Sequence, residues 1–280
     1  MPRRGDDRFP RAPSDREWAA LSEVERARVV ESLPAELSLE EFQPEGDPHI
    51  QAKLAAFDAL RGHFGKLRRP VYLAMDLTVY YPAERRFAPD LLAVLDVDPR
   101  PRMKWVVSAE GKGLDFVLEV HVRGKRRKDH ERNVAWYAAL GIREYFAYDR
   151  GRQRLAGWRL PRAGGSAYEP VPEANGRLAS AVLGLELTLE GEGLRFYQGT
   201  AALLEERELR ERLEVLVSDV QRRADAEARR AREEARRAEE EARRAEEAAR
   251  RAVEEARRGE QAEQRVAELT RELERLRSGG

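Results

Sequence analysis

The sequence has 280 residues, of which 41% are hydrophobic and 37% are charged, so part of it carries more charge than a packed core holds. Its 52 basic and 52 acidic residues give a formal net charge of zero, which excludes binding of nucleic acid through bulk positive charge. It contains no cysteine, which excludes disulfide frameworks and thiol nucleophiles, and with 4 histidines a metal site would depend mainly on carboxylates, the ligands of magnesium and manganese.

The N-terminal segment predicts a helix and no signal peptide. Residues 1–18 contain no apolar run of signal-peptide length, and the chain has no apolar run long enough to cross a membrane, so we expect a cytoplasmic protein. A helix is predicted over residues 14–32, because Ser14 is a good N-cap, Glu17 completes a capping box three positions later, and Pro34 follows the end.

The next 170 or so residues mix helix and strand patterns. Strands are predicted where apolar residues alternate or run together between turn residues, and helices where they recur every three or four positions. The fold class is therefore α/β, a mixed sheet flanked by helices. The predicted helices are 49–64 and 128–140, and the predicted strands are 71–81, 90–97, 115–122, 143–149, 154–160 and 181–197.

Composition changes abruptly near residue 200 and predicts one long helix. From Leu203 onward the chain has no proline and no aromatic residue. Its middle part repeats Ala-Arg-Arg every seven residues, and leucines and valines with the same spacing stand on both sides. Two interpretations stay open, a dimeric or trimeric coiled coil through residues 203–277 and a solitary helix braced by Glu–Arg pairs. The alanines lie at positions 228, 231, 235, 238, 242, 245, 249, 252 and 256.

Acidic residues in two of the predicted strands are the first candidates for chemistry. In strand 115–122, the alternation puts Glu119 and His121 on one face, about 7 Å apart by strand rise. Asp90 follows Pro89 and opens an otherwise apolar strand. Two carboxylates that meet at a strand end can bind magnesium, with waters completing its shell. Each acid also has an ordinary interpretation, a turn residue for Asp90 and a surface ion pair for Glu119.

Several segments follow one another in a characteristic order. They are Pro89-Asp90, Leu118-Glu119-Val120, Tyr137, the run from Gly141 to Asp149, YEPV (168–171), GRL (176–178) and the strands within 183–197. This order resembles the PD-(D/E)XK nuclease superfamily and, more closely, the bacterial Uma-two type of restriction endonuclease. The resemblance implies a restriction-endonuclease-like domain over residues 45–198, after an N-terminal helical extension over 1–44 and before a long helix or coiled coil over 199–278.

The resemblance implies a metal-dependent endonuclease that acts on DNA. In such a site Asp90 and Glu119 would hold Mg²⁺ or Mn²⁺ together with the carbonyl of Val120. A lysine would orient or activate the attacking water.

The sequence departs from the family at the lysine. The position two residues after Glu119 is His121, and the position four residues before the helix tyrosine is Asn133. Lys128 and Lys125 are alternative candidates for the lysine. His121 is an alternative base, because imidazole titrates near neutral pH.

Basic residues near the proposed site predict contact with DNA phosphates. Residues 123–128 carry five positive charges, and Arg100, Arg102 and Lys104 form a second group. The ordinary interpretation of the first group is a solvated loop.

Three functions therefore compete. The first is a DNA endonuclease that forms a homo-oligomer, or binds a partner, through residues 203–277. The second is a catalytically degenerate nuclease-fold scaffold that acts through its coiled coil, and the missing lysine favours it. The third is a structural coiled-coil protein with the globular part as a cap, which the many strands and aromatic residues of that part disfavour.

Overall fold

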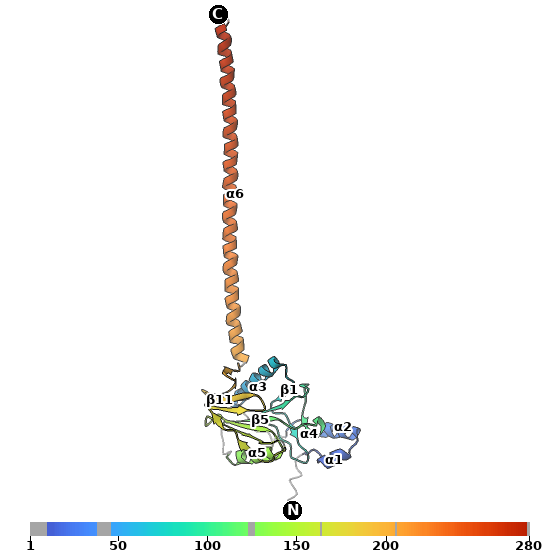
Figure 1. Cartoon of the computed structure of the whole chain (residues 1–280). Helices are drawn as coiled ribbons and strands as arrows, with labels where there is room; N and C mark the ends of the chain where they lie inside the picture. The colour runs from blue at the N-terminus through green and yellow to red at the C-terminus, as the bar shows by residue number, and fades with distance from the viewer. Residues whose placement is uncertain (1–9, 38–45, 123–126, 163, 205, 279–280) are drawn as a thin grey trace, which may run out of the picture. The chain divides into compact units, whose positions relative to one another are not determined.

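A computed structural model describes residues 10–37, 46–122, 127–162, 164–204 and 206–278, without the side chains of 127–131, 206–207 and 276–278. The chain forms two units, Met1–Arg210 and Glu211–Gly280. The first is a mixed α/β unit and the second is part of one long helix, α6 (Glu206–Ser278), so the predicted fold class is confirmed (Figure 1). Among the described helices, none is both long and apolar enough to span a membrane.

A mixed six-stranded sheet is the centre of the first unit, with strand order β1-β3-β5-β6-β7-β8. Its neighbouring strands are antiparallel except β5 and β6, which are parallel because helix α5 (Arg127–Ala139) connects them. The strands are β1 (Val71–Ala74), β3 (Leu91–Leu95), β5 (Phe116–His121), β6 (Glu144–Asp149), β7 (Arg154–Arg159) and β8 (Glu169–Pro170).

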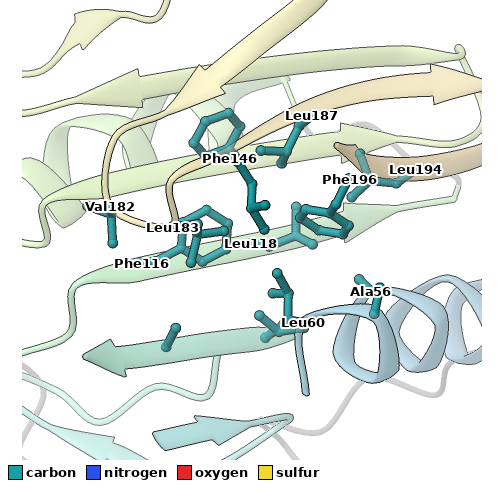
Figure 2. Packing of buried hydrophobic residues seen from close by; sticks show 14 of the residues in the cluster. Ala56, Leu60, Phe116, Leu118, Phe146, Val182, Leu183, Leu187, Leu194 and Phe196 are labelled. Atoms are coloured by element: carbon teal, nitrogen blue, oxygen red, sulfur yellow. The ribbon is translucent and has the colours of Figure 1, made fainter. Parts of the chain in front are cut away.

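One face of this sheet packs against helix α3 (Asp47–Leu67) and a second sheet. Strand alternation sends Phe116 and Leu118 of β5 to this face, where they meet Leu60 of α3 and Phe196 of the second sheet (Figure 2). The second sheet is antiparallel, with order β13-β12-β11-β10-β9. Its strands are β9 (Glu173–Ala174), β10 (Arg177–Ser180), β11 (Leu185–Glu190), β12 (Gly193–Gln198) and β13 (Ala201–Ala202).

The opposite face of the central sheet holds a second core rich in aromatic residues. Val117 of β5 and Tyr145 of β6 point to this face and pack with Tyr137 of α5. Helices α3 and α5 therefore lie on opposite sides of β5 (Figure 1). A short parallel pair, β2 (Val79–Tyr80) and β4 (Trp105–Val106), adds Val79 and Trp105 to this core, and helix α4 (Val107–Glu110) follows β4.

The predicted N-terminal helix is two helices, α1 (Asp15–Ala20) and α2 (Glu23–Ser32). The capping box of Ser14 and Glu17 is confirmed. The first helix ends at its C-cap Leu21, and a second capping box, formed by Ser22 and Glu25, begins the second helix.

The predicted strand 71–81 is also divided. It ends as β1 at Ala74, and Asp76 adopts a left-handed backbone with φ of 52° before the chain resumes as β2. The amide of Asp76 donates a hydrogen bond of 3.0 Å to the carbonyl of Pro89, which ties this turn to the start of β3. The turn therefore lies beside Asp90.

Candidate active site

Asp90 stands immediately before β3, at the point where the chain enters the sheet. Its side chain is mostly buried, and its Oδ2 accepts a hydrogen bond of 2.6 Å from the amide of Val120. This contact arises because β3 and β5 are antiparallel, with Leu91 opposite Leu118. Asp90, which precedes Leu91, therefore lies beside Glu119 and Val120, which follow Leu118. Pairing of the two strands thus brings the two predicted acids together.

Glu119 lies on the α5 face of β5. The phenol of Tyr137, on α5, donates a hydrogen bond of 2.6 Å to Oε1 of Glu119. Burial and the negative charge of Asp90 raise the pKa of Glu119 well above its usual value, and the Tyr137 hydrogen bond opposes this only in part. Glu119 therefore tends to keep its proton while Asp90 is ionised.

Asp90 is held in its ionised form by basic neighbours. Burial would raise the pKa of Asp90, but hydrogen bonds from His49 and from the Val120 amide, with the charge of Lys53, outweigh it and lower the pKa below its usual value. The two carboxylates therefore titrate as a pair, with their pKa values pushed apart. Such a separation is common where buried acids meet at a functional site.

Two basic residues of α3 complete this cluster, and no motif in the sequence marks them. Nε2 of His49 lies 3.1 Å from Oδ1 of Asp90, and Nζ of Lys53 lies 3.9 Å from the same oxygen. Nζ of Lys53 is also 2.8 and 2.7 Å from the two carboxylate oxygens of Asp76. A signal existed in the sequence, because His49, Lys53 and the buried Ala56 recur at helical spacing.

This geometry can be set beside known proteins. A family model described as "Uma2: Putative restriction endonuclease" matches residues 36–190. The chain belongs to the Uma2 family. No curated protein matches it. A solved structure, titled as a "putative nuclease belonging to DUF820 from Anabaena variabilis ATCC 29413", is similar with a TM-score of 0.39 and 13% identity, over 51% of this chain and 76% of that one.

The other predicted site residues of this Uma2 chain have different positions. His121 is half-buried at the end of β5, and strand alternation puts it on the face of Glu119. Asn133 is half-buried on α5, one turn before Tyr137. Lys128 lies on the first turn of α5, but its side chain and the linker 123–126, which contains Lys125, fall outside the described residues.

The second predicted basic group has structural roles. The guanidinium of Arg102 is mostly buried and pairs with both carboxylate oxygens of Glu110, at 2.7 and 3.0 Å. The ammonium of Lys104 donates to the carbonyl of Leu33 at the end of α2. Arg100 is more than half exposed. Arg102 and Lys104 are therefore engaged within the protein, which does not support the prediction that they contact DNA phosphates.

The carboxylate pair fits a hydrated divalent cation. A cation would offset the repulsion between Asp90 and Glu119 that raises the pKa of Glu119. Magnesium is commonly held by one or two carboxylates, with waters and phosphate oxygens completing its shell. Within the described part of the chain, no group of three or more acidic or histidine side chains could hold a metal, so those oxygens would be needed here.

Proposed function

We propose that this Uma2 protein is an endonuclease that hydrolyses phosphodiester bonds of DNA with Mg²⁺ or Mn²⁺. The observation that carries the proposal is the convergence of Asp90 and Glu119 from neighbouring strands, where the charge of one raises the pKa of the other. Membership of a restriction-endonuclease family supports the reaction class. Phosphoryl transfer depends mainly on positioning and charge stabilisation, which such a pair provides with its metal.

The proposed metal ligands are the carboxylates of Asp90 and Glu119, with the carbonyl of Val120 as a third. When bound, the metal polarises the scissile phosphate and lowers the pKa of a water molecule. The amide of Val120 and the side chain of His49 hold the Asp90 carboxylate in place. The phenol of Tyr137 does the same for Glu119.

The hydrolysis has a simple atomic balance. The water oxygen bonds to phosphorus, and the bond from phosphorus to one sugar oxygen breaks, with its electron pair staying on that oxygen. The water loses one proton and the leaving oxygen gains one. We assign the removal of the water proton to His121 or Lys128, which follow Glu119 on β5 and on the next helix.

We also propose that residues 203–277 join two copies of the chain. A dimer would supply two active sites, one for each DNA strand. The apolar positions of α6 support this proposal, because Leu213, Leu216 and Leu273 are at least half exposed on the helix by itself.

The test is cleavage of supercoiled and linear DNA by the full chain with Mg²⁺, Mn²⁺ or EDTA. Asp90→Asn and Glu119→Gln keep the side-chain shapes, and each should lower the cleavage rate by about 100-fold or more. Asp58→Asn, on the far part of α3, is the matched control and should cleave as the wild type does. Calorimetric titration with Mn²⁺ should show binding to the wild type and weaker binding to both site variants.

Two results would contradict the proposal. One is wild-type cleavage, of DNA or of an RNA substrate, that persists in EDTA or in both site variants. The other is a wild-type protein that neither cleaves nor binds Mn²⁺, which would favour the catalytically degenerate scaffold.

A further inference from the structure

We propose that Lys53 is a catalytic residue whose ammonium group contacts the phosphate oxygens of the substrate beside Asp90 and Glu119. This inference rests on the proposed phosphodiesterase function and adds to it a residue that comes from α3. Its role is to keep a fixed positive charge at the reacting phosphate. It forms no covalent bond, and the atomic balance of the hydrolysis is unchanged.

The position of Lys53 in α3 would suit an apolar residue. It is 3% exposed and belongs to the buried stripe that continues with Ala56 and Leu60. Lysine is almost never buried to this degree unless it is paired, because its ammonium loses its hydration. A leucine here would extend the core without that cost. Lys53 is paired with Asp76 and lies near Asp90, so the buried stripe of α3 ends in a cation that meets the acidic cluster rather than in another packing residue.

The ammonium lies between a buried carboxylate and an exposed one. Nζ of Lys53 is 3.9 Å from Oδ1 of Asp90 and 2.7 Å from Oδ2 of Asp76, whose side chain is 57% exposed. An ion pair with so exposed a carboxylate is weakened by water and salt. A phosphate that enters from the solvent can therefore compete with Asp76 for the ammonium.

The backbone of Asp76 supports a positioning role for that residue. Its φ of 52° lies in the left-handed region, which is uncommon for residues other than glycine and occurs often at functional sites. The hydrogen bond from its amide to the carbonyl of Pro89 ties it to the residue before Asp90. The same turn thus orients both Asp76, which holds Lys53, and the entry to Asp90.

Charge also favours a further cation at this point. The two carboxylates would balance the charge of a bound divalent metal, so a phosphodiester would add one negative charge that is not yet offset. Repulsion between like charges would oppose substrate binding and would grow as charge builds on the phosphate oxygens. A fixed ammonium group beside Asp90 offsets that repulsion without reorganisation during the reaction.

The experiment compares full-length wild type, Lys53→Met, Lys53→Arg and Lys66→Met. Methionine keeps the length of the buried side chain without its charge, and Lys66 is an exposed lysine on the last turn of the same helix. With Mg²⁺, the single-turnover cleavage rate should fall about 100-fold in Lys53→Met and less in Lys53→Arg, which keeps the charge. Lys66→Met should retain the wild-type rate.

A second readout needs no metal. Binding of a short DNA duplex is measured in EDTA at several salt concentrations. If Lys53 contacts a phosphate, Lys53→Met should lower the slope of log Kd against log salt by about one unit. A lysine that only stabilises the fold would leave this slope unchanged.

The results separate this inference from the proposed function. If the wild type cleaves and Lys53→Met cleaves within about threefold of it, the role of Lys53 is refuted while the nuclease function stands. If the wild type does not cleave, both proposals fail. If Lys53→Met melts much earlier than the wild type, Lys53→Arg decides: a rate near that of the wild type supports the role of the charge, and a loss as large as that of methionine refutes it.

Discussion

At the scale of single residues, the site depends on groups that adjust the two carboxylates. Asp90 is lowered in pKa by neighbours on α3 and β5, whereas Glu119 is raised by burial and by the charge of Asp90. The phenol of Tyr137 acts in the opposite direction on the pKa of Glu119, because its hydrogen bond favours the ionised carboxylate. Burial and the nearby charge of Glu119 raise the pKa of Tyr137 itself, so it remains a hydrogen-bond donor at neutral pH.

Tyr137→Phe should therefore weaken metal binding more than it weakens the fold. Without the hydrogen bond, the pKa of Glu119 rises further, and a metal ion must compete with a more tightly held proton. We expect the Mg²⁺ concentration for half-maximal cleavage to rise about tenfold, as for other residues that support metal ligands. The stability cost should be roughly 1 kcal/mol, the usual effect of one lost hydrogen bond.

The matched control is Tyr168→Phe. The phenol of Tyr168 donates to the carbonyl of Ile142 at 2.8 Å and packs in the same aromatic core. It should lose similar stability and keep the wild-type requirement for Mg²⁺. Equal metal requirements in the two variants would show that Tyr137 does not support Glu119.

At the scale of secondary-structure elements, much of the architecture could be predicted from the sequence. The strands 90–97, 115–122, 143–149 and 154–160 are confirmed within two residues at each end, because each is a short apolar run between turn residues. The division of residues 14–32 was missed, although the second capping box at Ser22 is visible in the sequence. The division of 71–81 depends on the turn at Asp76, which has no glycine or proline to mark it.

Only part of the candidate site can be predicted from the sequence. Glu119 lies in β5 and Asp90 stands immediately before the adjacent strand β3, and their order along the chain points to a shared site. His49 and Lys53 reach the same place from α3, which is separated from β3 in sequence. Their approach depends on how the helix docks on the sheet, and neither local propensity nor strand pairing specifies that.

A buried carboxylate also links the two sheets. Glu144 of β6 is 2% exposed and accepts hydrogen bonds from the hydroxyl of Ser180 and from the amides of Ala181 and Val182, which follow β10. Burial raises the pKa of Glu144, and these hydrogen bonds offset only part of the effect. The folded state therefore holds the proton of Glu144 more tightly than the unfolded state does.

The ionisation of Glu144 should lower the free energy of unfolding as pH rises. The unfolded carboxyl ionises near its usual pKa of 4.5, whereas the folded one ionises at a higher pH, so the contribution of Glu144 is greatest below the unfolded pKa and is lost as pH rises through the folded pKa. Each unit of pKa difference corresponds to about 1.4 kcal/mol. Glu144→Gln has no such ionisation, so its stability relative to the wild type should improve between about pH 4 and about pH 7.5.

The measurement is urea unfolding of both proteins at these two pH values. Glu173→Gln, at an exposed position on β9, is the control and should follow the wild type at both. A difference between wild type and Glu144→Gln that stays constant with pH would contradict the predicted shift.

At the scale of the whole molecule, α6 is the feature from which association between chains can be predicted. The helix itself is confirmed, with a length of roughly 110 Å at 1.5 Å per residue. Glu–Arg pairs such as Arg250–Glu246 and Arg258–Glu254, each at 2.7 Å, run along its exposed surface. They brace the helix as the solitary-helix interpretation requires, but each is worth only a few tenths of a kcal/mol, so they do not decide between one helix and two.

The charges beside the alanine positions predict how salt affects the proposed dimer. With alanines 228, 235 and 242 as the first position of each heptad, a parallel pair of chains in register brings Glu234 opposite Glu239 and Glu241 opposite Glu246. Like charges at these flanking positions oppose association, and salt screens them. The proposed dimer should therefore tighten as salt is raised from about 50 to about 500 mM, measured by sedimentation equilibrium of the full chain.

Reversing the charge at two of these positions tests the arrangement directly. Glu234→Lys with Glu241→Lys turns both repulsive contacts of the parallel dimer into attractive ones, so it should tighten the dimer and reverse the effect of salt. The same change at Glu233 and Glu240, on the outer side of the helix, is the matched control and should leave association nearly unchanged. In an antiparallel pair that brings these two positions opposite each other, lysine would meet lysine where glutamate met glutamate, so the first variant would not associate more tightly than the wild type. A full chain that stays monomeric in every condition would exclude the dimer and leave α6 as a single helix.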